Sequence, residues 1–189
     1  MTSALASQIP GYTVGTWTID PVHSDVSFTV RHMMVSKVRG YFRTFEGTFT
    51  TAEDPADSSV SATIKLDSID TNQEQRNAHI RSADFFEVEK HPEMTYASTG
   101  VRFDGDDWII DGDLTLKGIT KQVSLNLEIN GFGPDAYGGT RAGFTAKGEI
   151  NRHDFNVSFN PALEGGGVVI GDKVTIVLEI EAVLDTPAA

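Results

Sequence analysis

One stretch interrupts an otherwise strand-like chain and decides its architecture: residues 68–98, SIDTNQEQRNAHIRSADFFEVEKHPEMTYAS. Thr71 and Glu74 have the Thr-x-x-Glu spacing of a capping box, in which two side chains satisfy free N–H groups at a helix start. Residues 72–82 include no Gly or Pro and only one β-branched residue, Ile80. This composition predicts a short helix.

The predicted helix is too polar to lie in a core, because its only apolar side chains are Ala78 and Ile80. Phe85 and Phe86 follow it, and Pro92 then favours an extended chain. We therefore expect a polar lid helix over one end of a β-structure, anchored there by two aromatic rings.

Most of the remaining chain alternates between apolar and polar residues with the period of a β-strand. The predicted apolar faces are Val26, Phe28 and Val30; Tyr41, Phe45, Gly47 and Phe49; Val60, Ala62, Ile64 and Leu66; Trp108, Ile110, Leu114 and Leu116; Val123, Leu125, Leu127 and Ile129; Ala142, Phe144, Ala146 and Ile150; and Val174, Ile176, Leu178 and Ile180. This pattern places Phe42 on the opposite face from Phe45. The alternation is lost over residues 151–171.

About eight long strands with one buried face each fit either a closed barrel or a two-sheet sandwich. Strands of ten or more residues, 18 glycines and a lid helix favour an all-β, antiparallel, lipocalin-like barrel of about eight strands. A barrel of that size can hold one small ligand. Residues 1–14 are expected to form a flexible arm, and residues 15–185 a single barrel domain.

Composition excludes several classes of function. A net charge of −12 argues against nucleic acid as a partner. The chain has no cysteine, and its five histidines lack metal-site spacing, so neither a thiol site nor a metal is expected. His23 is expected to make a structural hydrogen bond. Residues 1–14 do not resemble a secretory signal and no segment matches a membrane span, which predicts a cytoplasmic protein.

A basic window lies between Asp25 and Glu46, where the sequence contains no acid. Its cations surround the apolar run Met33-Met34-Val35. One interpretation is a cavity mouth, where methionines adapt to a lipid and cations meet an anionic head group or a membrane. The other is a solvated loop whose cations pair with nearby acids. The remaining members of the window are Arg31, His32, Lys37, Val38, Arg39 and Arg43.

The lid offers three further donors, Arg76, His79 and Arg81. One of them would hold a polar head group; alternatively, Arg81 pairs with Asp84, Arg76 pairs with Glu74 or a strand carboxylate, and the phenylalanines only anchor the helix. The inward aromatic residues would likewise line a cavity or pack an ordinary core. Small inward residues at Gly47, Ala62, Ala142 and Ala146 favour a channel.

Four stretches in order resemble the YceI-like family of polyisoprenoid-binding proteins, over roughly residues 15–185. They are Trp17-x-Ile19-Asp20-x-x-His23-Ser24-x-Val26-x-Phe28; Gly40-x-Phe42-x-x-Phe45-x-Gly47-x-Phe49; Ser68-Ile69-Asp70-Thr71 with Arg76, His79, Arg81-Ser82, Asp84-Phe85-Phe86-x-Val88 and Pro92-x-x-Thr95; and Gly112-Asp113-Leu114-Thr115-Leu116-Lys117-Gly118-Ile119-Thr120. The resemblance implies a barrel that holds a long prenyl chain. Many members of the family are exported and many are dimers, so the resemblance implies a homodimer.

The leading hypothesis is a non-enzymatic carrier that sequesters or transports a long-chain prenyl lipid, with transient membrane contact and no cofactor other than a bound polyprenyl or quinone-type lipid. An enzyme acting on such a lipid, with His79 or Asp84 as the reactive group, and a ligand-free structural or stress module are the alternatives. The predicted ligand contacts are Phe28, Val30, His32, Met34, Val38, Arg39, Phe42, Phe45, Arg76, His79, Ile80, Arg81, Phe85, Phe86, Met94, Trp108, Phe144, Phe155 and Phe159.

Overall fold

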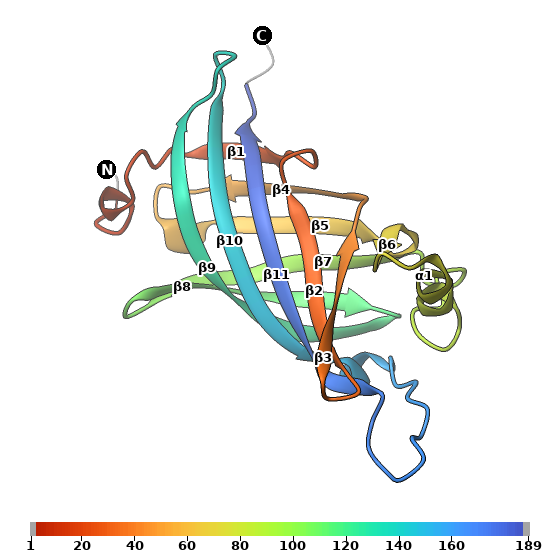
Figure 1. Cartoon of the computed structure of the whole chain (residues 1–189). Helices are drawn as coiled ribbons and strands as arrows, with labels where there is room; N and C mark the ends of the chain where they lie inside the picture. Colours follow the sequence, from red (N-terminus) through yellow and green to blue (C-terminus); the bar gives the residue numbers. More distant parts are fainter. Residues whose placement is uncertain (1–2, 187–189) are drawn as a thin grey trace.

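The computed structural model describes residues 3–186, and eleven strands in this part of the chain form one antiparallel sheet (Figure 1). The strands are β1 (Gly15–Ile19), β2 (Asp25–His32), β3 (Ser36–Phe42), β4 (Phe45–Thr51), β5 (Ser59–Lys65), β6 (Ile69–Asp70), β7 (Glu93–Asp104), β8 (Asp107–Leu116), β9 (Ile119–Pro134), β10 (Thr140–Asn151) and β11 (Ile170–Leu184). The helices are α1 (Glu74–Arg81) and the short 3-10 turns η1 (Ala6–Gln8), η2 (Pro55–Asp57), η3 (Leu66–Ser68) and η4 (Arg152–Phe155).

Eight strands close the barrel, in the order β1-β4-β5-β7-β8-β9-β10-β11, because β11 pairs with β1 as well as with β10. The predicted closed, eight-stranded antiparallel barrel is confirmed. β2 and β3 form a hairpin that continues the wall along residues 170–179 of β11, and β6 adds to the edge of β3. Full closure leaves few free strand edges, which removes a common site of aggregation.

The alternation changes phase between β3 and β4. Phe42 is buried and faces the barrel interior together with Phe45, whereas Tyr41 faces outward beneath the guanidinium of Arg43. The prediction that Tyr41 shares a face with Phe45 was therefore wrong. Arg43 and Thr44 lie between the two strands, and this irregularity shifts the inward positions from even to odd residue numbers.

Helix α1 confirms the short helix predicted for residues 72–82, but the predicted capping box was wrong. The N-cap is Gln73, whose side chain accepts a hydrogen bond from the backbone N–H of Arg76. Thr71 is buried and donates its hydroxyl to Asn77 Oδ1 at 2.6 Å. Asn72 has a positive φ angle of 64°, so the chain turns between Thr71 and the N-cap.

Trp17 closes the barrel where β1 lies between β4 and β11. Its side chain is fully buried, stacks on Phe49 and donates Nε1–H to Thr51 Oγ1 at 2.8 Å. Ala142 packs against Trp17 in this cluster, and Gly47 sits where a Cβ would approach Ile19 and β5 too closely. These two small residues therefore serve close packing and do not widen a channel, contrary to our prediction.

The ends of the barrel are covered by segments without regular strands. The predicted N-terminal arm packs on the barrel from Ser3 onward, with Ala6 buried in η1 and the Tyr12 hydroxyl donating to Ala52 O at 2.7 Å. At the other end lie α1 and the segment 152–169 (Figure 1). No helix within residues 3–186 is long and apolar enough to cross a membrane.

Arg152 holds the 152–169 segment in place. Its guanidinium is almost completely buried and donates to four backbone carbonyls, those of Val157, Phe159, Ile170 and Gly171, at 2.7–3.3 Å. Burial lowers the pKa of Arg152. Because the carbonyls satisfy the guanidinium, Arg152 fixes the insert that closes this end of the barrel.

Candidate functional site

A cavity of about 520 Å³ occupies the barrel interior. It reaches from Ile9 and Tyr12 in the N-terminal segment to α1 and Phe159 in the insert. Its wall exposes almost only apolar atoms, most of them from aliphatic and aromatic side chains at the inward positions of the strands. The volume lies within the ~300–1,000 Å³ typical of small-molecule sites.

Fifteen of the nineteen predicted contact residues line this cavity. The alternating pattern therefore placed most inward side chains correctly, although their contact with a ligand stays a prediction. The fifteen are Phe28, Val30, His32, Val38, Phe42, Phe45, Arg76, His79, Ile80, Phe85, Phe86, Met94, Trp108, Phe144 and Phe159.

The other four predicted residues lie outside the cavity lining. Met34 is exposed in the turn between β2 and β3, and Arg39 is exposed on the outer face of β3. Arg81 is bonded to Glu74 and to backbone carbonyls. Phe155 is 1% exposed and belongs to the surrounding packed core. These positions argue against direct contact with a molecule inside the barrel.

Sequence reasoning missed the N-terminal contribution to the cavity, which consists of Ile9 and Tyr12. The ring of Tyr12 packs edge-on against Phe132 at 5.4 Å, and burial raises the pKa of its hydroxyl. The arm shows no periodic pattern, so only its three apolar residues close to the first strand, Ile9, Tyr12 and Val14, offered a signal.

The cavity wall offers almost no free polar group. The Tyr96 hydroxyl, buried among strands, donates to Val123 O at 2.9 Å, and burial raises its pKa, so the phenol stays neutral. Gly112 provides the space for this ring, because a Cβ there would collide with it. Within residues 3–186, no buried side-chain nitrogen or oxygen lacks a hydrogen-bond partner. The interior is therefore suited to a molecule without hydrogen-bonding groups.

The lid end combines aromatic rings with polar groups. The His79 ring lies edge-on to Phe85 and Phe159, with centroids 5.1 and 4.9 Å away, and its Nε2 lies 2.7 Å from Asp84 Oδ2. The contact between His79 and Phe159 joins α1 to the insert. The carboxylate of Asp84 bonds to His79 and not to Arg81, so the alternative in which Arg81 pairs with Asp84 is wrong.

The two lid arginines have different surroundings. Arg81 Nη1 lies 2.9 Å from Glu74 Oε1, so the predicted Arg76–Glu74 pair is also wrong. Arg76 donates from Nε and Nη2 to the hydroxyl and carbonyl of Thr71, at 2.8 and 2.6 Å. Arg76 forms no ion pair within the described residues and lines the cavity, so it is the better placed of the two to meet an anion.

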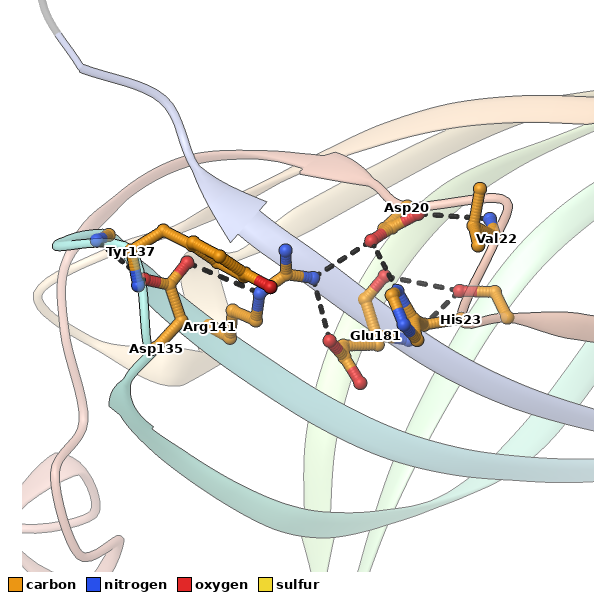
Figure 2. Close-up of polar contacts among 9 residues, drawn as sticks. Asp20, Val22, His23, Asp135, Tyr137, Arg141 and Glu181 are labelled. Carbon is orange, nitrogen blue, oxygen red and sulfur yellow. Dashed lines mark hydrogen bonds and ion pairs between the residues drawn. The ribbon is translucent and has the colours of Figure 1, made fainter.

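A polar cluster at the opposite end holds the strands together (Figure 2). Arg141 Nη1 lies 2.8 Å from Asp20 Oδ2 and 2.7 Å from Glu181 Oε1, and His23 Nδ1 lies 2.8 Å from Asp20. The hydrogen bond from Arg141, followed by that from His23, holds the pKa of Asp20 far below its usual range. The structural hydrogen bond predicted for His23 is confirmed.

Asp20, His23 and Glu181 bring three potential metal ligands within 4.8 Å of one another. The guanidinium of Arg141 bonds to both carboxylates, however, and neutralises charge that a cation would require. Figure 2 shows the arginine reaching from β10 across β11 toward the β1–β2 turn. We interpret the cluster as an ion-pair network that fixes the turn after β1.

Comparison with known proteins identifies the same architecture. A family model described as YceI-like domain matches residues 17–182. Protein YceI of Escherichia coli is 43% identical over 164 residues, which cover 85% of this chain and 82% of that protein.

Solved structures agree with the sequence relatives. A crystal structure of the Campylobacter jejuni YCEI protein superposes with a TM-score of 0.70 and 28% identity, covering 93% of this chain and 98% of the other. A polyisoprenoid binding domain from Saccharophagus degradans, implicated in plant cell wall breakdown, superposes with a TM-score of 0.66. It is 16% identical and covers 92% of this chain and all of that one, so this likeness concerns the fold.

Proposed function

Since this chain belongs to the YceI-like family, we propose that its barrel binds a long-chain polyisoprenoid and shields it from water. The observation that carries this proposal is the cavity of about 520 Å³ with an apolar wall. The Saccharophagus degradans domain, named for polyisoprenoid binding, has the same fold and supports this choice of ligand.

Apolar burial alone is sufficient for tight binding. About 20 enclosed carbon units at ~0.8 kcal/mol each would nominally give ~16 kcal/mol, which approaches the practical ceiling of ~18–21 kcal/mol for noncovalent complexes. Even large ordering losses then leave useful affinity. The polar head group would therefore mainly determine orientation and selectivity.

The head group is proposed to lie at the lid end, near Arg76 and His79. Both residues line the cavity and also border a shallow polar depression on the outside of α1, with Gln73 and Gln75. A prenyl chain could thus extend inward while its polar end remains hydrated. A charged or hydrogen-bonding head would gain a donor at this boundary without entering the apolar interior.

We propose binding and transfer of the lipid, without chemical conversion. The two groups considered for catalysis, His79 and Asp84, are bonded to each other at 2.7 Å and lie in a partly exposed position at the lid. The cytoplasmic location and the homodimer stay predictions, which fractionation of the source cells and light scattering of the purified protein would test.

A variant that blocks the cavity and a matched surface control test the proposal. Ala62 faces the cavity from β5, whereas Ala97 is exposed on the neighbouring strand β7. We expect organic extracts of the wild type and of Ala97→Trp to contain a long-chain prenyl lipid by mass spectrometry, and Ala62→Trp to lose it while keeping its circular dichroism spectrum. A wild type that neither carries prenyl lipid nor takes up a fluorescent prenyl probe would favour the ligand-free module.

A further inference from the structure

The turn between β2 and β3 exposes an apolar tip. Met33, Met34 and Val35 are all exposed there, and Val35 reaches 86%. Val168 is exposed on the adjoining insert, whose Val169 carbonyl accepts a hydrogen bond from Met33 N–H at 2.7 Å. These four residues are half of the eight large exposed apolar residues among those described. Figure 1 shows the hairpin and the insert projecting together beyond one end of the barrel.

The methionines occupy a backbone conformation that other residues adopt more easily. Met33 and Met34 have φ angles of 50° and 58°, and Val35 N–H closes the turn to His32 O at 3.2 Å. Two consecutive positive φ angles are typical of turns formed by Asn-Gly. Side chains in this region cost about 1–2 kcal/mol per residue. The turn is thus built against its local preference, which indicates that the side chains serve something other than the turn.

Basic residues flank this apolar tip. Arg31, Lys37 and Arg39 are exposed on the hairpin. None of them forms an ion pair within residues 3–186, whereas Arg43, farther from the tip, pairs with Asp70 at 3.0 Å. In a chain of net charge −12, this is a local surface of opposite sign. Its charge complements an anionic surface, which attracts basic segments over about a Debye length.

The tip is continuous with the cavity. His32 and Val38, on the same hairpin, line the cavity, as do Val169 and Ile170 on the adjoining segment. We propose that this end of the barrel docks on an anionic lipid bilayer, with Met33, Met34 and Val35 inserted among the acyl chains and the flanking cations at the head groups. The inference deepens the proposed function, because docking would place the cavity against the source of its lipid.

The sharpest test replaces the two methionines by the residues that the turn prefers. Met33→Asn with Met34→Gly should leave thermal stability unchanged or raised, since the strained backbone is relieved. Binding to vesicles of phosphatidylcholine with phosphatidylserine, measured by sedimentation, should fall at least tenfold because two apolar side chains no longer insert. Vesicle binding at the wild-type level in this stable variant would overturn the proposal.

Matched variants separate the apolar and charged contributions. Val35→Asp should abolish vesicle binding, whereas Val22→Asp, a valine that is 83% exposed at the other end of β2, should not. Lys37→Gln should weaken binding about fivefold, as expected for one cation near an anionic membrane. Lys147→Gln, on the outer face of β10, should change it less than twofold. Equal effects of each pair would show that only the overall composition matters.

Docking is separable from lipid storage. Vesicle binding is measured on protein stripped of lipid, and uptake of a fluorescent prenyl probe is measured in solution without vesicles. We expect the tip variants to take up the probe in solution but to deliver it slowly to anionic vesicles. If the wild type takes up the probe but does not bind anionic vesicles, docking is refuted and lipid storage is supported. If it binds the vesicles but does not take up the probe, lipid storage is refuted and docking is supported.

Discussion

Replacing Phe85 and Phe86 together by leucine distinguishes a lid that only covers the barrel from one that also contacts the ligand. Phe85 is 8% exposed, and its ring lies 5.1 Å from that of His79 and 5.3 Å from that of Phe159. Phe86 lies 6.1 Å from Phe42. Leucine retains most of the volume but none of these ring–ring contacts.

The structure sets the size of the expected effect on stability. Apolar swaps of similar size usually cost less than ~1.5 kcal/mol each, and an aromatic pair adds about 0.5–1.5 kcal/mol beyond its buried area. We expect the double variant to lose about 2–4 kcal/mol of unfolding free energy. A domain of ordinary stability, about 5–15 kcal/mol, remains folded after such a loss.

The effect on the ligand should appear as faster release. If the two rings cover about 60 Å² of a prenyl chain, losing that contact at ~25 cal/mol per Å² is worth ~1.5 kcal/mol, or roughly tenfold. Affinity differences within one site appear mostly in the dissociation rate. The measurement is therefore the release of a fluorescent prenyl probe into acceptor vesicles, alongside denaturant unfolding.

Phe155→Leu is the matched control, because Phe155 is buried beside the cavity without lining it. We expect it to lower stability by about 1 kcal/mol and to leave probe release unchanged. If the Phe85/Phe86 variant also releases the probe at the wild-type rate while losing stability, the two rings only anchor α1, and the assignment of the lid to the ligand site is refuted.

Four further substitutions test the remaining assignments. Arg76→Ala should speed release of a prenyl phosphate at least tenfold, from a charge-assisted bond of about 1.5–3 kcal/mol, but not release of a prenyl alcohol; Arg81→Ala should lower the melting temperature and treat both probes alike. Thr51→Val leaves the buried Trp17 N–H without its acceptor and should cost about 1–3 kcal/mol in denaturant unfolding; an unchanged midpoint would contradict that bond. Because the pKa of Asp20 is depressed in the folded state, its ionised form stabilises the fold above about pH 4 and this contribution is lost as the pH falls. Asp20→Asn should therefore have a lower unfolding free energy than the wild type at pH 7, and the difference between the two proteins should narrow as the pH falls. A difference in unfolding free energy that does not change with pH would contradict this assignment.

The inward faces of the barrel were predictable because strand alternation is a local property. Val26, Phe28 and Val30 point into the cavity, as their spacing predicted. The short helix was also readable, since its composition excludes a strand pattern over a full eight residues. The same local rule failed between Phe42 and Phe45, where two residues outside the strands change the phase without any sequence signal that alternation could detect.

Polar partners were less predictable than faces. Thr71 was expected to cap α1 but bonds to Asn77, and Arg81 bonds to Glu74, whereas one of the two alternatives paired it with Asp84. Several residues within reach in each sequence window offer equivalent donors and acceptors, and the path of the backbone decides among them. Arg141 joins Asp20 from 121 residues away, a distance at which spacing in the chain carries no information.

The sequence by itself determined the strands, most of their apolar faces, the single polar helix and the membership of a family, because these depend on residue periodicity and ordered motifs. Only the tertiary structure decided that the barrel interior remains hollow. Side chains from all the barrel strands share that interior, and the space they leave depends on how the strands close and on which small residues face which large ones. Gly40 and Gly112 illustrate this point: each accommodates the ring of an aromatic residue on a neighbouring strand, Phe28 and Tyr96 respectively. The space beside each of these glycines is thus filled by a neighbouring ring, whereas Ala62 borders the open cavity. This difference appears only when the strands are side by side.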